Sequence, residues 1–361
     1  MTTSLDHCDL GARVQAAVDA EMAAQAGVLA QLGDDMAPLV DAVATLLRGG
    51  KRLRAAFLYW GYRACGGQDS PALVRTATAM EFFQAAALLH DDVMDDSDTR
   101  RGMPSAHRRL GGLHTSHGWL GSSDRFGVAG AILGGDLCLT WTDELFATSG
   151  LPPHELDRAR PFFDTMRTQL MGGQFLDVLE SARGWDGEST QCRVERARRV
   201  IRYKSAKYTI EHPLLIGASA AGASGPDLAA LSCYGLALGE AFQLRDDLLG
   251  VYGDPAETGK PAGDDLREGK RTVLLAYALD SAGPAELAVY DKLLGWADID
   301  ATSIEELRSL IAASGAVDRV EALIERQSRA ACAALVGVHE ITDEGRHMLE
   351  QLVGVCSART S

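Results

Sequence analysis

The sequence lacks any long apolar run. No stretch of about 18 consecutive apolar residues occurs, so a transmembrane helix is not expected. The N-terminal sequence MTTSLDHCDLGARVQ also lacks the apolar core of a signal peptide. We therefore expect a cytoplasmic protein with no membrane span, in which any hydrophobic ligand would be bound inside the fold.

Cysteine is sparse and positive charge is in deficit. The seven cysteines are scattered and never form C-x-x-C, which fits free thiols in a reducing cytosol better than disulfides or a zinc site. The formal net charge is -15, whereas nucleic-acid binders carry a basic surface, so no nucleic-acid partner is expected. Such a chain can still bind a polyanion through bridging cations and a local group of Lys and Arg.

Aromatic residues make up only 6% of the chain, while Ala, Leu, Glu and Arg are abundant, which favours helix over strand. Apolar residues recur with helical spacing almost throughout. Helices are predicted at residues 10–48 (one or two), 51–65, 71–96, 128–148, 154–182, 188–221, 226–251, 270–281 and 284–296, with two or three more in 303–355. Polar, glycine-rich loops are predicted at 111–127 and 253–269. No linker is evident, so we expect one all-α domain over residues 1–361.

An acidic cluster ends the apolar helix predicted at residues 71–96. Asp91 and Asp95 are four residues apart and share a helix face, with Asp92 near the same edge. Such carboxylates repel one another unless a cation lies between them, and Mg²⁺ bridges carboxylates to substrate phosphates. A solvated acidic helix end is the alternative. The apolar sequence FFQAAALL before the cluster favours the metal.

A second acidic pair, Asp246 and Asp247, follows another apolar helix in GEAFQLRDDLLG. The position four beyond Asp246 is Gly250, so this cluster has two carboxylates where the first has three. Adjacent Asp residues are common on surfaces, and this pair alone is weak evidence. Together the two clusters lead to the hypothesis that they face each other and hold a diphosphate through Mg²⁺ ions.

Cationic residues accompany both clusters. In RGGKRLR, Lys51 and Arg54 are three apart after a double glycine, so on a helix both could reach one anion. Arg100 and Arg101 directly follow the first cluster and offer planar donors to phosphate. The further candidates are Lys204, Lys260 and Lys270. An ordinary solvated side chain is the alternative for each lysine.

The ordered motifs GGKRLR, DDVMDDSDTRRG, GGQFLD, YKSAKYT, FQLRDD and GKPAGDDLREGKRT resemble those of the trans-isoprenyl diphosphate synthase (polyprenyl synthetase) family. The resemblance extends from Gly49 to Thr272. It implies an all-α bundle around a deep central cavity, the isoprenoid synthase fold, and normally a homodimer. It implies an enzyme that joins isopentenyl diphosphate to dimethylallyl, geranyl or farnesyl diphosphate. The products would be a longer all-trans prenyl diphosphate and pyrophosphate.

The resemblance also implies roles for the motif residues. Three Mg²⁺ ions would be bound by Asp91, Asp92, Asp95, Asp246 and Asp247. The allylic diphosphate would be contacted by Arg100, Lys204 and Lys260, and the isopentenyl diphosphate by Lys51, Arg54, Gln84 and Arg101. Gln174 and Asp177 would line the same cavity, and Lys270 is a further cationic candidate. Many members carry a third Asp where this chain has Gly250, which puts metal affinity at the second cluster in question.

The implied reaction breaks a C–O bond and develops an allylic cation beside a leaving diphosphate. Metal ions, lysines and arginines would stabilise the leaving group, and a closed apolar cavity would exclude water from the cation. Carbonyl or hydroxyl dipoles of Lys204, Ser205 and Gln243 are expected to stabilise the cation. No protein base is obvious, and the departing pyrophosphate would take the proton.

Product length should depend on the helix before Asp91. Ala86 and Ala87 precede Asp91 by about 6–7.5 Å, at a level where farnesyl-length relatives carry bulky aromatics. Phe83 lies about 12 Å before Asp91 and is a candidate floor, although a core phenylalanine is an equal alternative. The expected product is geranylgeranyl diphosphate.

Three alternatives remain open. A class I terpene cyclase shares the first acidic motif, but it needs no isopentenyl diphosphate site such as GGKRLR and Arg101 would form. An inactive regulatory subunit of a heteromeric synthase is a second possibility, for which Gly250 is a small hint. A metal module built on His107, His114 and His117 is disfavoured because a fourth ligand is lacking, and these histidines are taken as loop residues.

Overall fold

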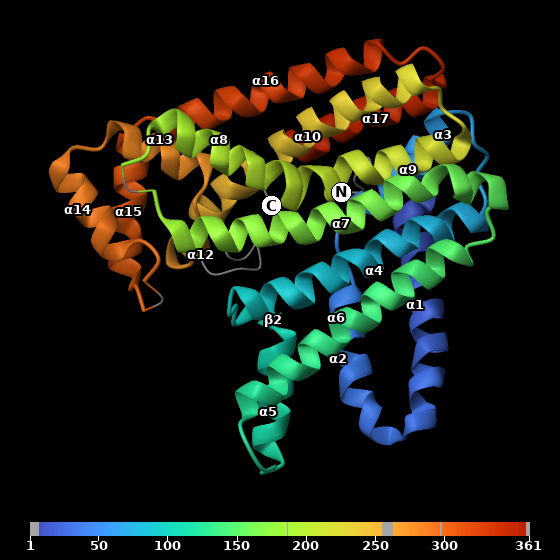
Figure 1. Ribbon diagram of the computed structural model, residues 1–361, viewed down its shortest axis with the longest axis horizontal. Coiled ribbons are helices and arrows are strands. Elements are labelled where there is room, and N and C mark those ends of the chain that lie inside the picture. Colours follow the sequence, from blue (N-terminus) through green and yellow to red (C-terminus); the bar gives the residue numbers. More distant parts are fainter. Residues whose placement is uncertain (1–6, 186, 255–262, 297, 359–361) are drawn as a thin grey trace. The chain divides into compact units, whose positions relative to one another are not determined.

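The computed structural model describes residues 7–185, 187–254, 263–296 and 298–358. Over these residues the chain is almost entirely helical, which confirms the predicted all-α class (Figure 1). Their only strands are β1 (Thr99–Arg100) and β2 (Met103–Pro104), which pair antiparallel. Backbone contacts divide the chain into two compact units, Met1–Pro161 with Ile216–Ala223 and Phe162–Leu215 with Ser224–Ser361.

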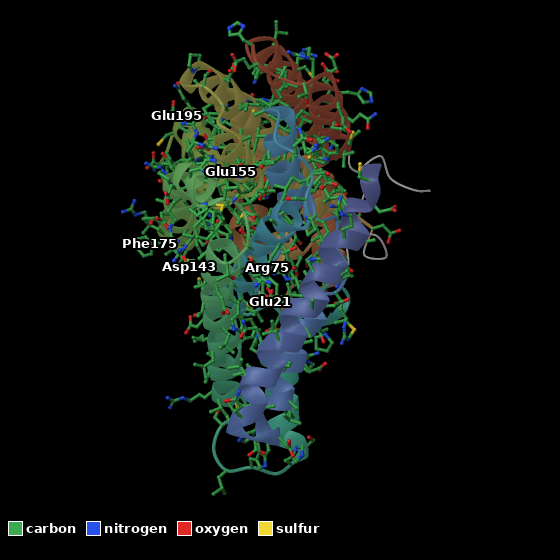
Figure 2. All side chains as sticks on the ribbon, turned by 90° about the vertical axis from the view of Figure 1, so that its right-hand side faces the viewer. Glu21, Arg75, Asp143, Glu155, Phe175 and Glu195 are labelled. Atoms are coloured by element: carbon green, nitrogen blue, oxygen red, sulfur yellow. The ribbon has the colours of Figure 1, made fainter. Side chains whose placement is uncertain are left out.

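The first unit is centred on α4 (Pro71–Met94), which packs against α1, α3 and α6. Its elements are η1 (His7–Asp9), α1 (Leu10–Leu29), η2 (Ala30–Leu32), η3 (Asp34–Met36), α2 (Ala37–Leu47), α3 (Leu53–Ala64), α4, β1, β2, α5 (Ala106–Ser116), α6 (Ser123–Ala147), the start of α7 (Pro153–Arg183) and the end of α9 (His212–Ala221). Figure 2 shows Arg75 of α4 beside Glu21 of α1, and a guanidinium nitrogen of Arg75 lies 3.2 Å from a Glu21 carboxylate oxygen.

Local signals explain how α4 begins. The Ser70 hydroxyl accepts a hydrogen bond from the Leu73 backbone N–H, and Pro71 occupies the first turn, where its missing N–H costs nothing. The helix then runs unbroken to Met94 through a buried core in which Phe82 meets the edge of Trp141. The first acidic cluster therefore lies at the end of a rigid, buried element.

The second unit is centred on α10 (Gly225–Tyr252), which packs against η4 and α16. Its other elements are the remainder of α7, α8 (Thr190–Val200), η4 (Ile201–Glu211), the start of α9, α12 (Asp264–Arg267), α13 (Val273–Ser281), α14 (Pro284–Leu293), α15 (Ala301–Ala313), α16 (Ala316–Val336) and α17 (Asp343–Ser357). Leu244 and Leu248 of α10 belong to a buried apolar core with α13, α15 and α16. The second acidic cluster thus also follows a buried helix.

The loop predicted at residues 111–127 is wrong for most of its length. Gly111 and Gly112 lie in α5 and Gly127 lies in α6, and only residues 117–122, which include Gly118 and Gly121, lie between these helices. A Cβ on Gly127 would lie 2.1 Å from the His107 carbonyl oxygen, so this glycine permits close packing of α5 against α6. The predicted 253–269 loop is also wrong in part, because Asp264–Arg267 form the short helix α12.

His107 and His114 are helical, which corrects their assignment to a loop, whereas His117 lies in the turn that follows α5, as expected. His107 and His114 are buried on α5. The His107 ring contacts the Ser105 hydroxyl at 3.2 Å, and His114 Nε2 lies 3.1 Å from the Leu120 carbonyl oxygen. In the described part of the chain, no helix combines the length and apolarity that crossing a membrane requires.

Candidate active site

The first acidic cluster lies at the C-terminal end of α4. Asp91 and Asp92 are in the last turn, and Asp95 caps the helix with its N–H donating to the Asp91 carbonyl oxygen at 2.8 Å. The negative end of a helix disfavours carboxylates, because the unpaired carbonyls already carry partial negative charge. Three acidic residues at this place therefore require compensation by positive charge.

Arg100 supplies part of that compensation. It donates through Nε and a terminal nitrogen to Asp92 Oδ1, with the Nε distance at 2.7 Å, and a terminal nitrogen lies 3.6 Å from Asp91 Oδ2. The Asp92 side chain is only 2% exposed, whereas that of Asp91 is 18% exposed. The structure therefore brings the predicted residues Arg100, Asp91 and Asp92 together, with Asp92 engaged by arginine.

Arg101 covers the double glycine of the first cationic motif. Gly50 has φ +94, and a Cβ built on it would lie 3.2 Å from an Arg101 terminal nitrogen. The Arg101 guanidinium donates to the backbone carbonyls of Leu46 and Arg48 at 2.9 and 3.2 Å. These contacts join two motifs that are far apart in the sequence.

Several positive charges gather around Arg101. Burial lowers the pKa of Arg101, and the charges of Arg52, Arg100 and Arg54 lower it further, while Glu81 opposes them. Like charges held this close favour an anion among them. The surroundings of Arg101 therefore suit a phosphate group.

Arg52, which the sequence analysis passed over, anchors this group. Its side chain is buried, pairs with Glu81 at 2.8 Å and donates to the Leu47 carbonyl oxygen, and its backbone has φ +52. Because α3 begins only at Leu53, Lys51 lies before the helix, and the predicted shared helix face of Lys51 and Arg54 is wrong. Lys51 is exposed and Arg54 is half-buried.

The residues expected to set product length lie inside α4. Phe83 and Ala86 are fully buried, whereas Gln84 and Ala87 are half-buried. The helix is unbroken over this span, so the distance from Asp91 along its axis remains about 12 Å to Phe83. The structure thus supports the spacing on which the chain-length prediction depends.

In the second unit, Lys204 pairs with Asp177, Nζ to Oδ2 at 2.6 Å. This ion pair joins GGQFLD on α7 to YKSAKYT on η4. The close approach depends on Gly173, where a Cβ would lie 2.4 Å from the Tyr203 carbonyl carbon and 2.5 Å from the Lys204 nitrogen. Gln174 is half-buried beside it, and Phe175 projects outward from α7 (Figure 2).

Lys204 and Ser205 lie in the middle of a π-helical segment, η4, which continues directly from α8 into α9. Long π-helices are rare, and π turns occur frequently at functional sites. On the side of α10, a Cβ on Gly239 would lie 2.6 Å from the Ala206 Cα, so this glycine allows α10 to pack closely on the segment. Sequence periodicity predicted a helix at 188–221 but could not indicate its wider turns.

The second acidic cluster has one exposed and one buried carboxylate. Asp246 is exposed, whereas Asp247 is 7% exposed and accepts a hydrogen bond from Gln243 Nε2 at 2.8 Å. Burial raises the pKa of Asp247, and the negative charges of Asp265 and Asp246 raise it further, against the Gln243 hydrogen bond and the charge of Lys270. The structure thus brings Gln243 and Asp247 together.

Asp265 is a residue of this site that the sequence analysis did not identify. It lies on α12, is 9% exposed, and pairs through Oδ1 with Lys270 Nζ at 3.2 Å. Lys270 also pairs with Glu268 at 2.8 Å. The predicted residue Lys260 lies outside the described residues.

The donor set fits a metal ion that arrives with a diphosphate. The described residues contain no preformed group of three or more His, Cys, Asp or Glu side chains that could hold a metal ion. Mg²⁺ normally takes only one or two carboxylates and completes its shell with phosphate oxygens and water. Carboxylates with arginines and lysines beside them, as in each unit, have the composition that such a bridged ion requires.

A cavity of about 320 Å³ in the second unit holds none of the predicted site residues. It is lined by Trp185, Gly187, Arg193, Arg271, Leu279, Leu287, Tyr290, Asp291 and Leu294. It therefore belongs to a place other than the acidic clusters, although Arg271 directly follows Lys270 in the sequence.

Comparison with known proteins agrees with this chemistry. Residues 37–311 match the family model described as polyprenyl synthetase. The chain is 32% identical to the geranylfarnesyl diphosphate synthase of Aeropyrum pernix, over 84% of this chain and 89% of that protein. It is 33% identical to the geranylgeranyl diphosphate synthase of Mycobacterium tuberculosis, over 79% and 75% of the two chains.

A solved structure is similar over nearly the whole chain. The geranylgeranyl pyrophosphate synthase of Corynebacterium glutamicum, complexed with isoprenyl diphosphate and magnesium, superposes with a TM-score of 0.90 at 40% identity, covering 96% of this chain and 97% of that one. The fold and the motifs define an enzyme of the isoprenoid synthase class. This chain belongs to the polyprenyl synthetase family, and it is a polyprenyl diphosphate synthase, a trans-prenyltransferase.

Proposed function

We propose that this synthase condenses isopentenyl diphosphate with an allylic diphosphate to give geranylgeranyl diphosphate and pyrophosphate. The observation that carries the proposal is the unbroken helix α4, with Asp91 in its last turn and the buried residues Ala86 and Phe83 one and two turns earlier. Small residues near Asp91 leave room for a chain beyond C15, and a buried phenylalanine about 12 Å away limits it near C20. The similarity to geranylgeranyl diphosphate synthases supports the same product.

The residues divide into two sets. The allylic diphosphate and its metal ions are assigned to Asp91, Asp92, Asp95, Arg100, Gln174, Lys204, Lys260, Asp246 and Asp247, and the isopentenyl diphosphate to Lys51, Arg54, Gln84 and Arg101. Lys270 adds positive charge beside the second cluster. Within the first set, Asp92 orients Arg100, since its buried carboxylate accepts two hydrogen bonds from that guanidinium.

Magnesium ions, proposed as three, would act as Lewis acids on the leaving diphosphate when bound. The chain's own groups then have distinct tasks. Arg100 and Lys204 stabilise the negative charge that develops as the C–O bond breaks, because preorganised donors cost no reorganisation during the reaction. Dipoles of Ser205 and Gln243, together with the Lys204 backbone carbonyl, stabilise the allylic cation. The buried apolar face of α4 keeps water away from that cation.

For the whole chain, we further propose that the two compact units act as one polyprenyl synthetase domain and that two chains form a homodimer. Exposed apolar side chains on α6 and α7 support the dimer, among them Leu133 at 56% and Phe175 at 65% exposure. The cytoplasmic location expected from the cysteine pattern remains a prediction.

The test is incubation of the purified chain with Mg²⁺, radiolabelled isopentenyl diphosphate and each allylic starter in turn, followed by dephosphorylation and reverse-phase sizing. Incorporation of label into geranylgeraniol is expected. A cyclic hydrocarbon formed without consumption of isopentenyl diphosphate would identify a terpene cyclase instead. Activity that appears only after a second, different subunit is added would identify a regulatory subunit.

A further inference from the structure

The cavity of about 320 Å³ in the second unit combines apolar and cationic walls. Its apolar wall consists of one aromatic ring and three leucines, Trp185, Leu279, Leu287 and Leu294. Two guanidinium groups, those of Arg193 on α8 and Arg271 before α13, line the same space. The volume lies at the lower end of the range for ligand pockets, about 300–1,000 Å³, and far exceeds the roughly 30 Å³ of one water molecule. The cavity is therefore large enough for a small organic molecule.

Arg193 is a half-buried residue of α8 whose guanidinium forms no ion pair within the described part of the chain. Its Nε is buried without a hydrogen-bond partner. Asp280, whose pKa is lowered by hydrogen bonds from Thr190 and Arg319 and further by the charges of Arg319 and Arg193, is already engaged. It accepts from the Thr190 hydroxyl at 2.5 Å and from Arg319 at 2.9 Å. Arg193 can therefore bind an anion without giving up an internal ion pair.

Tyr290 of α14 places a second unsatisfied polar group at the cavity wall. The residue is 2% exposed, and its hydroxyl is buried without a hydrogen-bond partner among the described residues. Burial raises the pKa of Tyr290, so this hydroxyl stays protonated and remains a donor. Most buried polar groups in folded proteins are paired, and an unpaired one asks for an explanation. Two such groups around one cavity, Arg193 Nε and the Tyr290 hydroxyl, are typical of a site that a ligand completes.

The aromatic part of the wall is held in place. Trp185 is 4% exposed and packs into the apolar core of the second unit, and its Nε1 donates to Glu180 at 3.5 Å. The guanidinium carbon of Arg271 lies 5.8 Å from the centre of the Trp185 ring, which orients that cation beside the cavity. Asp291 is the one carboxylate among the described residues that line the cavity, and it is exposed, so water screens its charge. The wall as a whole favours an anion that carries apolar surface.

We propose that this cavity binds a small organic anion, a molecule with a carboxylate or phosphate head and an apolar or aromatic body. The head pairs with Arg193, because arginine matches the planar geometry of carboxylate and phosphate oxygens. The body lies against Trp185 and Leu287. An inorganic anion would leave the apolar wall uncovered, and a neutral apolar molecule would leave the guanidinium unpaired, so the ligand needs both parts. This site is separate from the diphosphate sites of the proposed function.

The test is fluorine NMR of the full chain labelled with 5-fluorotryptophan, in which Trp185→Phe assigns the Trp185 signal by its loss. Phenyl phosphate and benzoate are titrated with a chelator present, so that no metal-dependent site competes. At least one of them should shift the Trp185 signal saturably, and the tighter one identifies the head. Phenol and inorganic phosphate, which each lack one part, should bind at least about 10-fold more weakly. No saturable shift with either anion, or equal binding of inorganic phosphate, would overturn the proposal.

Two pairs of variants locate the probe in the cavity. Arg193→Gln should weaken binding of the tighter anion by about 10-fold or more, whereas Arg199→Gln removes the same charge from an exposed position of α8 and should bind as the wild type does. Leu287→Glu places a carboxylate in the apolar wall and should abolish binding. Ala288→Glu adds the same charge at the next, exposed position of α14, outside the cavity lining, and should retain binding.

Thermal unfolding of each variant establishes that it is folded. Wild-type affinity in either Arg193→Gln or Leu287→Glu would overturn the proposal, and so would equal losses in the test and control variants, because a general effect of charge predicts that result. The titrations use neither substrate nor Mg²⁺, so their outcome does not depend on the proposed prenyl transfer. Arg193→Gln should also keep wild-type prenyl transfer activity, since Arg193 has no part in the proposed catalytic site.

Discussion

At the residue scale, the predicted site residues are held by hydrogen-bonded partners. Arg100 is held by Asp92, Lys204 by Asp177, and Asp247 by Gln243. Each pair fixes the direction of a long or flexible side chain before substrate arrives, so less conformational entropy is lost on binding. Function at this scale therefore depends on partners as much as on the groups that touch substrate.

The product-length assignment is tested by changing α4. Phe83→Ala should lengthen the main product beyond C20, because it removes the buried ring two turns before Asp91, and Ala86→Phe should shorten it toward C15. Reverse-phase sizing of dephosphorylated products measures both. Phe82→Leu is the control, since Phe82 packs on Trp141, and its product should stay at C20. Unchanged product length in both Phe83→Ala and Ala86→Phe would reject Phe83 as the residue that limits chain growth.

His212 should make stability depend on pH. Its pKa is lowered from 6.5 to about 4, mainly by burial, and its Nδ1 is buried without a hydrogen-bond partner while Nε2 lies 3.2 Å from the Gln169 side-chain oxygen. Protonation would bury an unpaired N–H. The unfolded chain takes up a proton near pH 6.5 and the folded chain only near 4, so stability is lost as pH falls through that window.

The corresponding measurement is the free energy of unfolding in urea for the wild type and His212→Asn from pH 7 to pH 4.5. The wild type and the variant differ only at position 212, so the difference between their two curves isolates the titration of His212. The wild type should lose on the order of 2 kcal/mol more than the variant over that range. Parallel curves would show that His212 titrates normally in the folded chain.

At the element scale, glycines allow some helices to approach closely. Gly173 brings α7 onto the backbone of η4 beside Lys204, and Gly127 brings α6 onto α5. The existence and approximate ends of most helices followed from apolar periodicity. Gly111, Gly112 and Gly127 were misleading, because a glycine in a helix contact and a glycine in a turn look alike in one sequence.

Other features of the elements could not be predicted from the sequence. The π-helical turns of η4 are one such feature, because apolar periodicity in a single sequence does not report how wide a helical turn is. Arg52 and Asp265 lie inside recognised motifs, but the sequence did not indicate their contacts. Arg52 pairs with Glu81, and the Asp265 carboxylate lies against Gly250, where a side chain would clash with it. The metal ligands and cations on motif positions were predictable, whereas their pairing was not.

Gly173→Ala tests the contact between α7 and η4. The new methyl group would lie 2.4 Å from the Tyr203 carbonyl carbon, so one helix must shift, at a cost of about 1–3 kcal/mol in the free energy of unfolding. Displacement of Lys204 should also reduce kcat. Gly172→Ala is the matched control, because nothing lies within 4 Å of its Cβ, and it should stabilise α7 by up to about 1 kcal/mol. Equal stability of the two variants would contradict this account.

At the scale of the whole molecule, the all-α class and the family were predictable because many separated motifs agree. The proposed homodimer can be tested at the same scale. Leu133 on α6 and Phe175 on α7 are exposed apolar residues, which a dimer interface would bury. Light scattering after size exclusion should show a dimer for the wild type and a monomer for Leu133→Asp or Phe175→Asp. Val336→Asp on α16, where Val336 is 76% exposed, is the control and should remain dimeric.

Both acidic clusters are proposed to be needed for turnover of the allylic diphosphate with Mg²⁺. The most direct test is kcat/KM for the allylic diphosphate at limiting Mg²⁺ in Asp91→Ala, Asp246→Ala and the double variant, each shown to be folded. Each single change should cost about 1,000-fold or more, and the double variant should be hardly worse, as for residues that act as a unit. Wild-type turnover in either single variant would contradict the account.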